Sequence, residues 1–154
     1  MARVAVQALR GEAERQRQSA KMLVMMLLGI ALAGAVGTLC RYGMTGWVQR
    51  WLGPEFPWGT LSVNLLGCLL LGLLMELTRH TGWVPSNIRS IVGIGFLGAF
   101  TTFSTFGFET FRAIEGGDWL GGLFNVLLNM TGGFALVAVG TGLARWAVEM
   151  RGGL

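Results

Sequence analysis

The sequence is poor in charged residues. Only 13% of its 154 residues are Asp, Glu, Lys or Arg, whereas soluble domains carry about 25%. Hydrophobic residues make up 53% of the chain, so too little charge remains to cover the surface of a water-soluble fold. This shortage excludes an ordinary soluble domain.

Groups that bind metals or act as nucleophiles are also scarce. His80 is the only histidine and follows Arg79 in a stretch that we expect to be a polar loop, so it has no partner for a metal site. Cys40 and Cys68 lie in apolar runs without the C-x-x-C spacing of a metal or redox site, and we interpret them as small buried hydrophobic side chains. An enzyme needs a nucleophile–base pair or a metal cluster, and the sequence offers neither. Enzymatic activity is therefore not expected.

What the sequence does contain is four long runs without a charged residue. Each has 19 residues or more, and about 20 residues of helix span the ~30 Å hydrocarbon core of a bilayer. The runs are Met22–Cys40, Phe56–Met75, Ser90–Phe108 and Trp119–Ala144. They predict an all-α membrane protein with four transmembrane helices. These helices are expected at about 22–45, 57–78, 86–113 and 119–145.

The four runs also set the domain organisation. We expect one transmembrane domain over 21–147, a polar basic N-terminal tail over 1–20 and a short C-terminal tail over 148–154. The N-terminal tail is either an interfacial helix or a frayed segment. The net charge of +4 does not indicate nucleic acid, because five of the twelve basic residues fall within the first 21 residues, beside anionic headgroups. The lipid bilayer is the expected partner.

Glycine is abundant, with 25 residues, mostly within the runs. Gly29, Ala33 and Gly37 repeat at i, i+4 and i+8 and form a stripe of small residues on the first helix. Such stripes mark close helix contacts, because lipid supplies no hydrophobic force between helices. Four short glycine-rich helices enclose little interior, which favours an oligomer with its working surface between subunits.

The third run contains an unusual cluster of hydroxyl groups. Four hydroxyl side chains lie within positions 101–105, behind glycines at positions 93, 95 and 98. Irregular backbone at membrane depth is tolerated only where it is buried in protein or lines a wet cavity. One interpretation is a helix broken at mid-membrane, whose free carbonyl and amide groups suit ions. The other is that Ser and Thr bond back to their own helix.

Neutral side chains inside the runs indicate the kind of ion. Phe103 and Phe106 share one helix face, where they serve either ordinary packing or contact between an anion and their electropositive ring edges. Asn64 is either a helix–helix contact or a pore ligand, and Asn125 and Asn129 form a stripe on the fourth helix. These neutral donors, with almost no buried carboxylates, favour a small anion as the transported species.

Two charged residues border this set. Arg41 ends the first helix and either draws anions toward a vestibule or extends to the lipid headgroups. Glu109 lies three residues past Phe106, toward the end of the third span.

Three blocks of the sequence resemble the signature blocks of the Fluc (CrcB) fluoride-channel family, in that family's order. The blocks are Gly37-Thr-Leu-Cys-Arg41-Tyr42, Gly59-Thr60-Leu-Ser-Val63-Asn64-Leu-Leu-Gly67 and Thr101-Thr-Phe-Ser-Thr-Phe106. The resemblance covers roughly residues 27–143. It implies a fluoride-selective channel of the cell inner (plasma) membrane that exports fluoride passively from the cytoplasm. It also implies an antiparallel dual-topology homodimer with two pores and a central sodium ion.

The resemblance further implies roles for individual residues. Phe103 and Phe106 would face fluoride, Asn64 would be the pore amide, and Ser104 and Thr105 would be the adjoining hydroxyls. The remaining expected pore residues are Arg41, Glu109, Asn125 and Asn129.

For sodium, the resemblance implies the backbone carbonyls of Gly98 and Thr101. Two departures from the family pattern occur. Ala99 replaces the second glycine before the break, and Asn125 and Asn129 align where many members carry a tyrosine and a serine.

The alternative function is a small four-helix, proton-coupled multidrug-type exporter. Such a protein needs an ionisable carboxylate within the membrane. The first run contains none, and Glu76 and Glu109 are expected at or near span ends, so this alternative is disfavoured.

Overall fold

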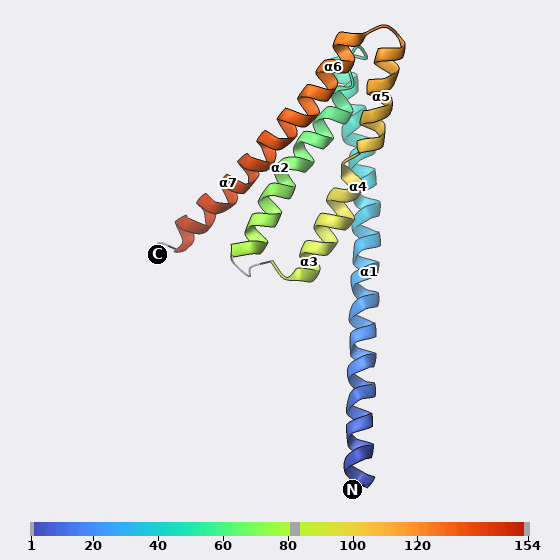
Figure 1. Cartoon of the computed structure of the whole chain (residues 1–154), viewed down its shortest axis with the longest axis vertical. Coiled ribbons are helices and arrows are strands. Elements are labelled where there is room, and N and C mark those ends of the chain that lie inside the picture. Colours follow the sequence, from blue (N-terminus) through green and yellow to red (C-terminus); the bar gives the residue numbers. More distant parts are fainter. Residues whose placement is uncertain (1, 81–83, 153–154) are drawn as a thin grey trace.

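The computed structural model describes residues 2–80 and 84–152, and the side chains of residues 2–6, Ala8 and His80 lie outside this description. All regular structure in these residues is helical (Figure 1). The elements are α1 (Ala2–Leu52), α2 (Trp58–His80), α3 (Ser86–Ser90), the π-helical η1 (Ile91–Leu97), α4 (Gly98–Phe100), α5 (Phe103–Glu115), α6 (Trp119–Leu127), the π-helical η2 (Leu128–Gly132) and α7 (Gly133–Gly152).

Four helical stretches are long and apolar enough to cross a membrane. They are Leu9–Leu52, Trp58–Arg79, Ser86–Glu115 and Trp119–Gly152. The prediction of an all-α protein with four apolar helices is therefore confirmed.

The boundaries of the first and last helices differ from the expected ones. Helix α1 begins at Ala2 rather than near residue 22, and α7 continues to Gly152 rather than ending near 145. The segment expected as a polar tail over 1–20 is rich in Ala, Arg, Glu and Gln, which are strong helix formers and extend the helix outside the apolar run. Helix α1 ends where Gly53 adopts a φ of +91° directly before Pro54. Figure 1 shows its N-terminal half extending beyond all other elements.

The small-residue stripe of α1 makes close helix contacts, as predicted. A Cβ atom at Gly37 would collide with the carbonyl of Phe96, and one at Gly29 would lie 2.7 Å from Ile91 Cδ1. Ala33 lies against Gly95, where an added Cβ would be 3.0 Å away. The stripe therefore holds α1 against η1.

Helices α2 and α7 run side by side in the same direction (Figure 1). Glycines let their backbones touch, because a Cβ at Gly72 would collide with the Val137 carbonyl and one at Gly140 with the Leu69 carbonyl. Close backbone approach of this kind is the usual way in which membrane helices associate.

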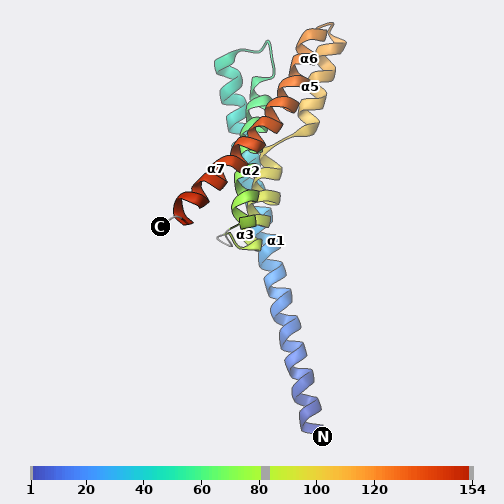
Figure 2. The same ribbon diagram turned by 60° about the vertical axis from the view of Figure 1, so that its left-hand side comes forward.

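The α5–α6 hairpin diverges from the C-terminal end of α1, so the two form separate prongs at one end of the molecule (Figure 2). Gly117, with a φ of +88°, turns the chain, and Asp118 Oδ1 accepts from Gly121 N at 2.8 Å to begin α6. Many large apolar side chains remain exposed, among them Phe108 and Phe124. A single chain therefore leaves wide apolar surfaces for lipid or another protein to cover.

Two neighbouring glycines of α7 give a test of the backbone contact. In Gly140→Ala the new methyl group would meet the Leu69 carbonyl, whereas in Gly142→Ala it would meet nothing within 4 Å. We expect Gly140→Ala to lower the free energy of unfolding by about 1–3 kcal/mol. Gly142→Ala should be neutral or stabilising by up to about 1 kcal/mol. Thermal unfolding in detergent, followed by circular dichroism, measures both, and equal midpoints for the two variants would contradict the contact.

Candidate functional site

The helical path of the third span is interrupted at Thr101 and Thr102. Thr101 has φ −89° and ψ 161°, and Thr102 has φ −150° and ψ 120°, so both are extended between α4 and α5. The Thr102 hydroxyl caps α5, because its oxygen accepts from Thr105 N at 3.2 Å and it donates to Thr105 Oγ1 at 2.9 Å. In a continuous helix the Thr102 N–H would donate to the Gly98 carbonyl. Here that N–H is turned toward α2.

Asn64 of α2 holds the extended segment by hydrogen bonds to both backbone groups of Thr102. The Thr102 N–H donates to Asn64 Oδ1 at 2.9 Å, and Asn64 Nδ2 donates to the Thr102 carbonyl at 3.1 Å. Asn64 Nδ2 also donates to Asn129 Oδ1 at 3.0 Å. Since a backbone N–H can only donate, the orientation of the Asn64 amide is determined. Both of its amide hydrogens are bonded within the chain.

The hydrogen bonds continue from Asn129 along the fourth span. Asn129 Nδ2 donates to Asn125 Oδ1 at 2.9 Å and to the Asn125 carbonyl at 3.0 Å. Asn125 Nδ2 donates to Thr110 Oγ1, and Thr110 Oγ1 donates to the Phe106 carbonyl, each at 2.8 Å. We call this series from Thr102 to Phe106 the amide relay. It joins α2, α5, α6 and η2, and Asn125 is only 1% exposed within it.

A cavity of about 280 Å³ lies beside the relay, and we call it the phenylalanine groove. Its lining residues are Asn64, Gly67, Cys68, Leu71, Gly93, Leu97, Gly98, Thr101, Thr102, Phe103, Phe106, Asn129 and Met130. The rings of Phe103 and Phe106 have centroids 5.6 Å apart and are tilted by 57°. Phe103 is 77% exposed, whereas Phe106 is 6% exposed.

The electrostatics of this groove depend on the rings. The two amides that line it, Asn64 and Asn129, donate to protein acceptors as described above. The Thr101 hydroxyl donates to the Leu97 carbonyl at 3.1 Å. Phe103 and Phe106 line the same groove, and the edge of an aromatic ring is electropositive, so these rings can contact an anion without a hydrogen-bond donor.

A second cavity, of about 510 Å³, lies along the C-terminal half of α1, and we call it the arginine groove. Its lining residues are Thr38, Arg41, Tyr42, Gly43, Thr45, Gly46, Arg50, Thr60, Thr102 and Thr105. It combines two guanidinium groups with five hydroxyl-bearing threonines, which suits an anion. Thr102 lines both grooves, so it forms the wall between them.

Not all the expected site residues face a groove. Ser104 is exposed and lines neither of them, and Asn125 contributes only through the relay. Glu109 Oε1 accepts from Thr60 Oγ1 at 2.8 Å, which places this carboxylate behind the arginine groove. Within the described residues, Glu109 Oε2 is buried and has no hydrogen-bond partner.

Comparison with known proteins identifies the family. A family model described as CrcB-like protein, Camphor Resistance (CrcB), matches residues 28–141. The chain belongs to the CrcB-like family. A fluoride-specific ion channel FluC of Citrifermentans bemidjiense is 46% identical over 119 residues, which cover 77% of this chain and 96% of that relative.

Other CrcB-like relatives are similar to the same extent. Proteins of the same name from Syntrophotalea carbinolica and Chloroflexus aurantiacus are 46% and 41% identical over 121 and 120 residues. These matches cover 79% and 78% of this chain, and 98% and 95% of the relatives. With channel relatives and four apolar helices, this CrcB-like chain is a multi-pass membrane protein.

The carbonyls around the break have the chemistry of a site for a hard cation. Gly98 and Thr101 line the phenylalanine groove, and the Gly98 carbonyl lacks its helical donor because the Thr102 N–H bonds to Asn64. Hard cations prefer oxygen ligands such as carbonyls. Over residues 2–80 and 84–152 no group of three His, Cys, Asp or Glu side chains could hold a metal. The residues present therefore fit a carbonyl-bound cation.

Sequence reasoning named neither Thr102 nor Thr110 as a site residue. Thr102 could have been found as a helix cap, because it precedes a helical run and lies three residues before Thr105. Thr110 lies four residues after Phe106, the spacing at which a threonine bonds back to a carbonyl. Its second bond, from Asn125, comes from another span and left no local signal.

The amide relay predicts a large difference between two asparagines. Asn64→Ala leaves the Thr102 N–H and carbonyl without their partner, and each unpaired buried group costs about 1–3 kcal/mol. Asn87 in α3 is exposed, so Asn87→Ala should change stability by less than about 0.5 kcal/mol. Unfolding midpoints in detergent measure both. Equal stability of the two variants would show that Asn64 does not hold the break.

Proposed function

We propose that this protein is a fluoride-selective channel that lets fluoride leave the cytoplasm passively, and that it is not an enzyme. The observation that carries the proposal is the phenylalanine groove, which is lined by the neighbouring rings of Phe103 and Phe106, whose edges are electropositive. A weak site without a charged side chain suits an anion that must also leave again. The relatives named fluoride-specific ion channel FluC support fluoride as that anion.

The proposed path uses both grooves. Arg41 and Arg50 raise the local concentration of anions in the arginine groove. The hydroxyls of Thr102 and Thr105 then replace part of the water around the ion. On the other side of Thr102 the ion contacts the ring edges of the phenylalanine groove. Each contact is weak by itself, so the ion moves on rather than remaining bound.

Such a pore would lower fluoride toxicity without an energy source. In acidic surroundings fluoride enters cells as neutral HF, which ionises in the cytoplasm and is trapped there. A selective pore in the inner (plasma) membrane lets the anion run back down its gradient. A proton-coupled exporter needs a carboxylate that exchanges protons, but Glu76 is ion-paired with Arg145. Glu109 has one buried oxygen without a hydrogen-bond partner among the described residues, but its other oxygen accepts from Thr60, and the relatives named fluoride-specific ion channel FluC favour the channel.

The same proposal includes an antiparallel homodimer. The arginine groove is polar, yet it lies on helices whose other surfaces are apolar. Polar groups at membrane depth must face water or protein rather than lipid. A second copy of the chain would cover this surface and enclose the open phenylalanine groove, which supports dimerisation. Antiparallel pairing would place a pore for each copy in the same assembly.

Sodium at the centre of the dimer is the remaining part of the proposal. The carbonyls of Gly98 and Thr101 would hold the ion, which would supply positive charge to neutralise opposed carbonyl groups. The protein's own part is to keep these carbonyls out of helical hydrogen bonding. Asn64 does so for Gly98 by binding the Thr102 N–H, and the Thr102 hydroxyl does so for Thr101 by binding the Thr105 N–H.

Fluoride efflux from proteoliposomes, followed with a fluoride electrode, tests the function. In Phe106→Ile the side chain keeps much of its bulk but loses the ring quadrupole. We expect efflux to fall by about fivefold, since an aromatic contact is worth about 1 kcal/mol and each 1.4 kcal/mol in a barrier is tenfold. Phe108→Ile is the matched control, because Phe108 is exposed on the same helix and lines neither groove. No fluoride efflux from the unaltered protein would refute the channel.

The cation proposal predicts a monovalent ion on the Gly98 and Thr101 carbonyls. Replacing sodium by an organic cation during purification should lower fluoride efflux and the unfolding midpoint together, because carbonyls would then face one another unpaired. Anomalous scattering from a heavier monovalent ion would locate the site. Unchanged efflux and stability after complete removal of sodium would rule out a structural ion there.

The unequal distribution of basic residues opposes insertion of the chain into the membrane equally in both orientations. With four spans, the side that holds the termini carries nine Lys and Arg, namely Arg3, Arg10, Arg15, Arg17, Lys21, Arg79, Arg89, Arg145 and Arg151. The opposite side carries three, Arg41, Arg50 and Arg112. The positive-inside rule therefore favours cytoplasmic termini, whereas an antiparallel homodimer needs both orientations.

We expect the intact chain to insert both ways with an excess of cytoplasmic termini. Deleting residues 1–20 removes Arg3, Arg10, Arg15 and Arg17 and leaves five basic residues against three. A C-terminal topology reporter should then move closer to an even split. A reporter that is wholly cytoplasmic with and without this segment would rule out the antiparallel homodimer and require an oppositely oriented partner protein.

A further inference from the structure

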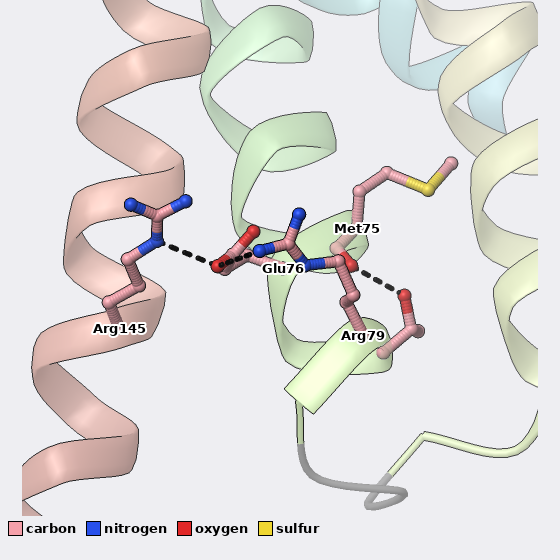
Figure 3. A network of polar contacts seen from close by, with 5 residues as sticks. Met75, Glu76, Arg79 and Arg145 are labelled. Atoms are coloured by element: carbon pink, nitrogen blue, oxygen red, sulfur yellow. Dashed lines mark hydrogen bonds and ion pairs between the residues drawn. The ribbon is translucent and has the colours of Figure 1, made fainter.

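The parallel pair α2–α7 carries a second polar contact far from the grooves. Glu76 of α2 is 6% exposed, and its Oε1 accepts from Arg145 Nε of α7 at 2.7 Å (Figure 3). Arg79 Nη2 lies 3.8 Å from the same oxygen. Figure 3 shows Arg145 reaching Glu76 across the space between the two helices, whereas Arg79 comes from Glu76's own helix. Of these two contacts, the one from Arg145 joins α2 to α7.

The amide relay ties the same two segments of chain together at the other end. Asn64 of α2 binds Asn129, which lies in η2 directly before α7. Asn64 and Glu76 are twelve residues apart, which is about 18 Å along a helix. The two polar contacts thus bracket one helix interface.

Much of the surface between these contacts is glycine packed closely against the facing helix. Gly72 faces the Val137 carbonyl, Gly140 faces the Leu69 carbonyl, and Gly133 faces Cys68. Such faces allow close approach, but they lack the large side chains that interlock and resist sliding along the helix axis. Directional contacts must then set the register, and charge-assisted hydrogen bonds are the most directional available.

We propose that the Glu76–Arg145 pair sets the register of α7 on α2 and so positions Asn129 against Asn64. Both residues are positioning residues, since neither lines the arginine groove or the phenylalanine groove. A carboxylate buried in a membrane span is costly unless it is paired, so α7 is held where Arg145 meets Glu76. A shift of one residue, about 1.5 Å, would separate Asn129 from Asn64 and open the relay.

A disulfide can report the register directly. A Cβ atom at Gly133 would lie 3.3 Å from Cys68 Sγ, close enough for a disulfide to form without backbone movement. In a Cys40→Ser background, Gly133→Cys should therefore cross-link to Cys68 under mild oxidation. Adding Glu76→Ala should slow this cross-linking by about tenfold or more, because the facing sulfur atoms lose their alignment. This measurement does not depend on the proposed channel function.

Glu149→Gln is the matched control for loss of a carboxylate. Glu149 borders the same small cavity as Glu76 and Arg145, but it is exposed. Cross-linking should proceed in this variant as in the parent protein. Glu76→Gln keeps an oxygen that Arg145 can reach, so it should restore most of the rate that Glu76→Ala loses. Equal cross-linking rates in Glu76→Ala and the parent would overturn the proposal.

Fluoride efflux supplies the second readout, and only this one rests on the proposed function. Glu76→Ala and Arg145→Ala should each lower efflux by about 10- to 100-fold, the usual effect of misplacing a group by about 1 Å. The double variant should be no slower than the slower single variant, since both changes remove one contact. Effects that multiply would show that the residues act separately and would overturn the pair. Slowed cross-linking in a protein that conducts no fluoride at all would leave the register function intact and refute the channel instead.

Discussion

The structure depends on the double hydrogen bond between the Asn64 amide and the backbone of Thr102. In a bilayer an unpaired peptide group has no water to bond with, so an extended segment inside a span needs a partner from elsewhere in the protein. One side-chain amide has the geometry to serve both a donor and an acceptor of the same residue. This pairing releases the Gly98 carbonyl, lets Thr102 cap α5 and directs Phe103 and Phe106 to one groove. Without it, the Thr102 N–H and carbonyl would lose these partners inside the span.

The amide relay explains how helices with little interlocking core keep a defined site. Its members come from α2, the third span and the fourth span, and each hydrogen bond fixes the direction of the next. The π-helical segments η1 and η2 both contribute to the lining of the phenylalanine groove. Such segments turn side chains away from their regular helical positions and often accompany functional sites. Order at the site therefore comes from hydrogen bonds more than from apolar packing.

Local pattern determined how much could be predicted from the sequence. The four apolar runs and the stripe of Gly29, Ala33 and Gly37 depend on composition and on helical period, and the structure agrees with both. The ends of α1 could not be read in the same way, because Ala, Arg and Gln extend a helix whether or not lipid surrounds it. Asn64 carried two interpretations, and its contacts with Thr102, 38 residues away, and with Asn129, 65 residues away, show that both amide hydrogens are bonded. The hydrogen bond between Glu76 and Arg145 joins residues 69 positions apart, so it could not be predicted from local sequence pattern either.

Thr102 is the wall between the arginine groove and the phenylalanine groove, and this thinness has an electrical consequence. Water conducts, so once both grooves are hydrated the membrane potential no longer falls evenly over the ~30 Å hydrocarbon core. In the proposed pore it would fall mainly across the short stretch at Thr102, which lines both grooves. A full crossing is worth about 2.3 kcal/mol per elementary charge at 100 mV. An anion that passes Thr102 would experience most of that energy within a step of a few ångströms, while the long approaches on either side would be nearly free of field.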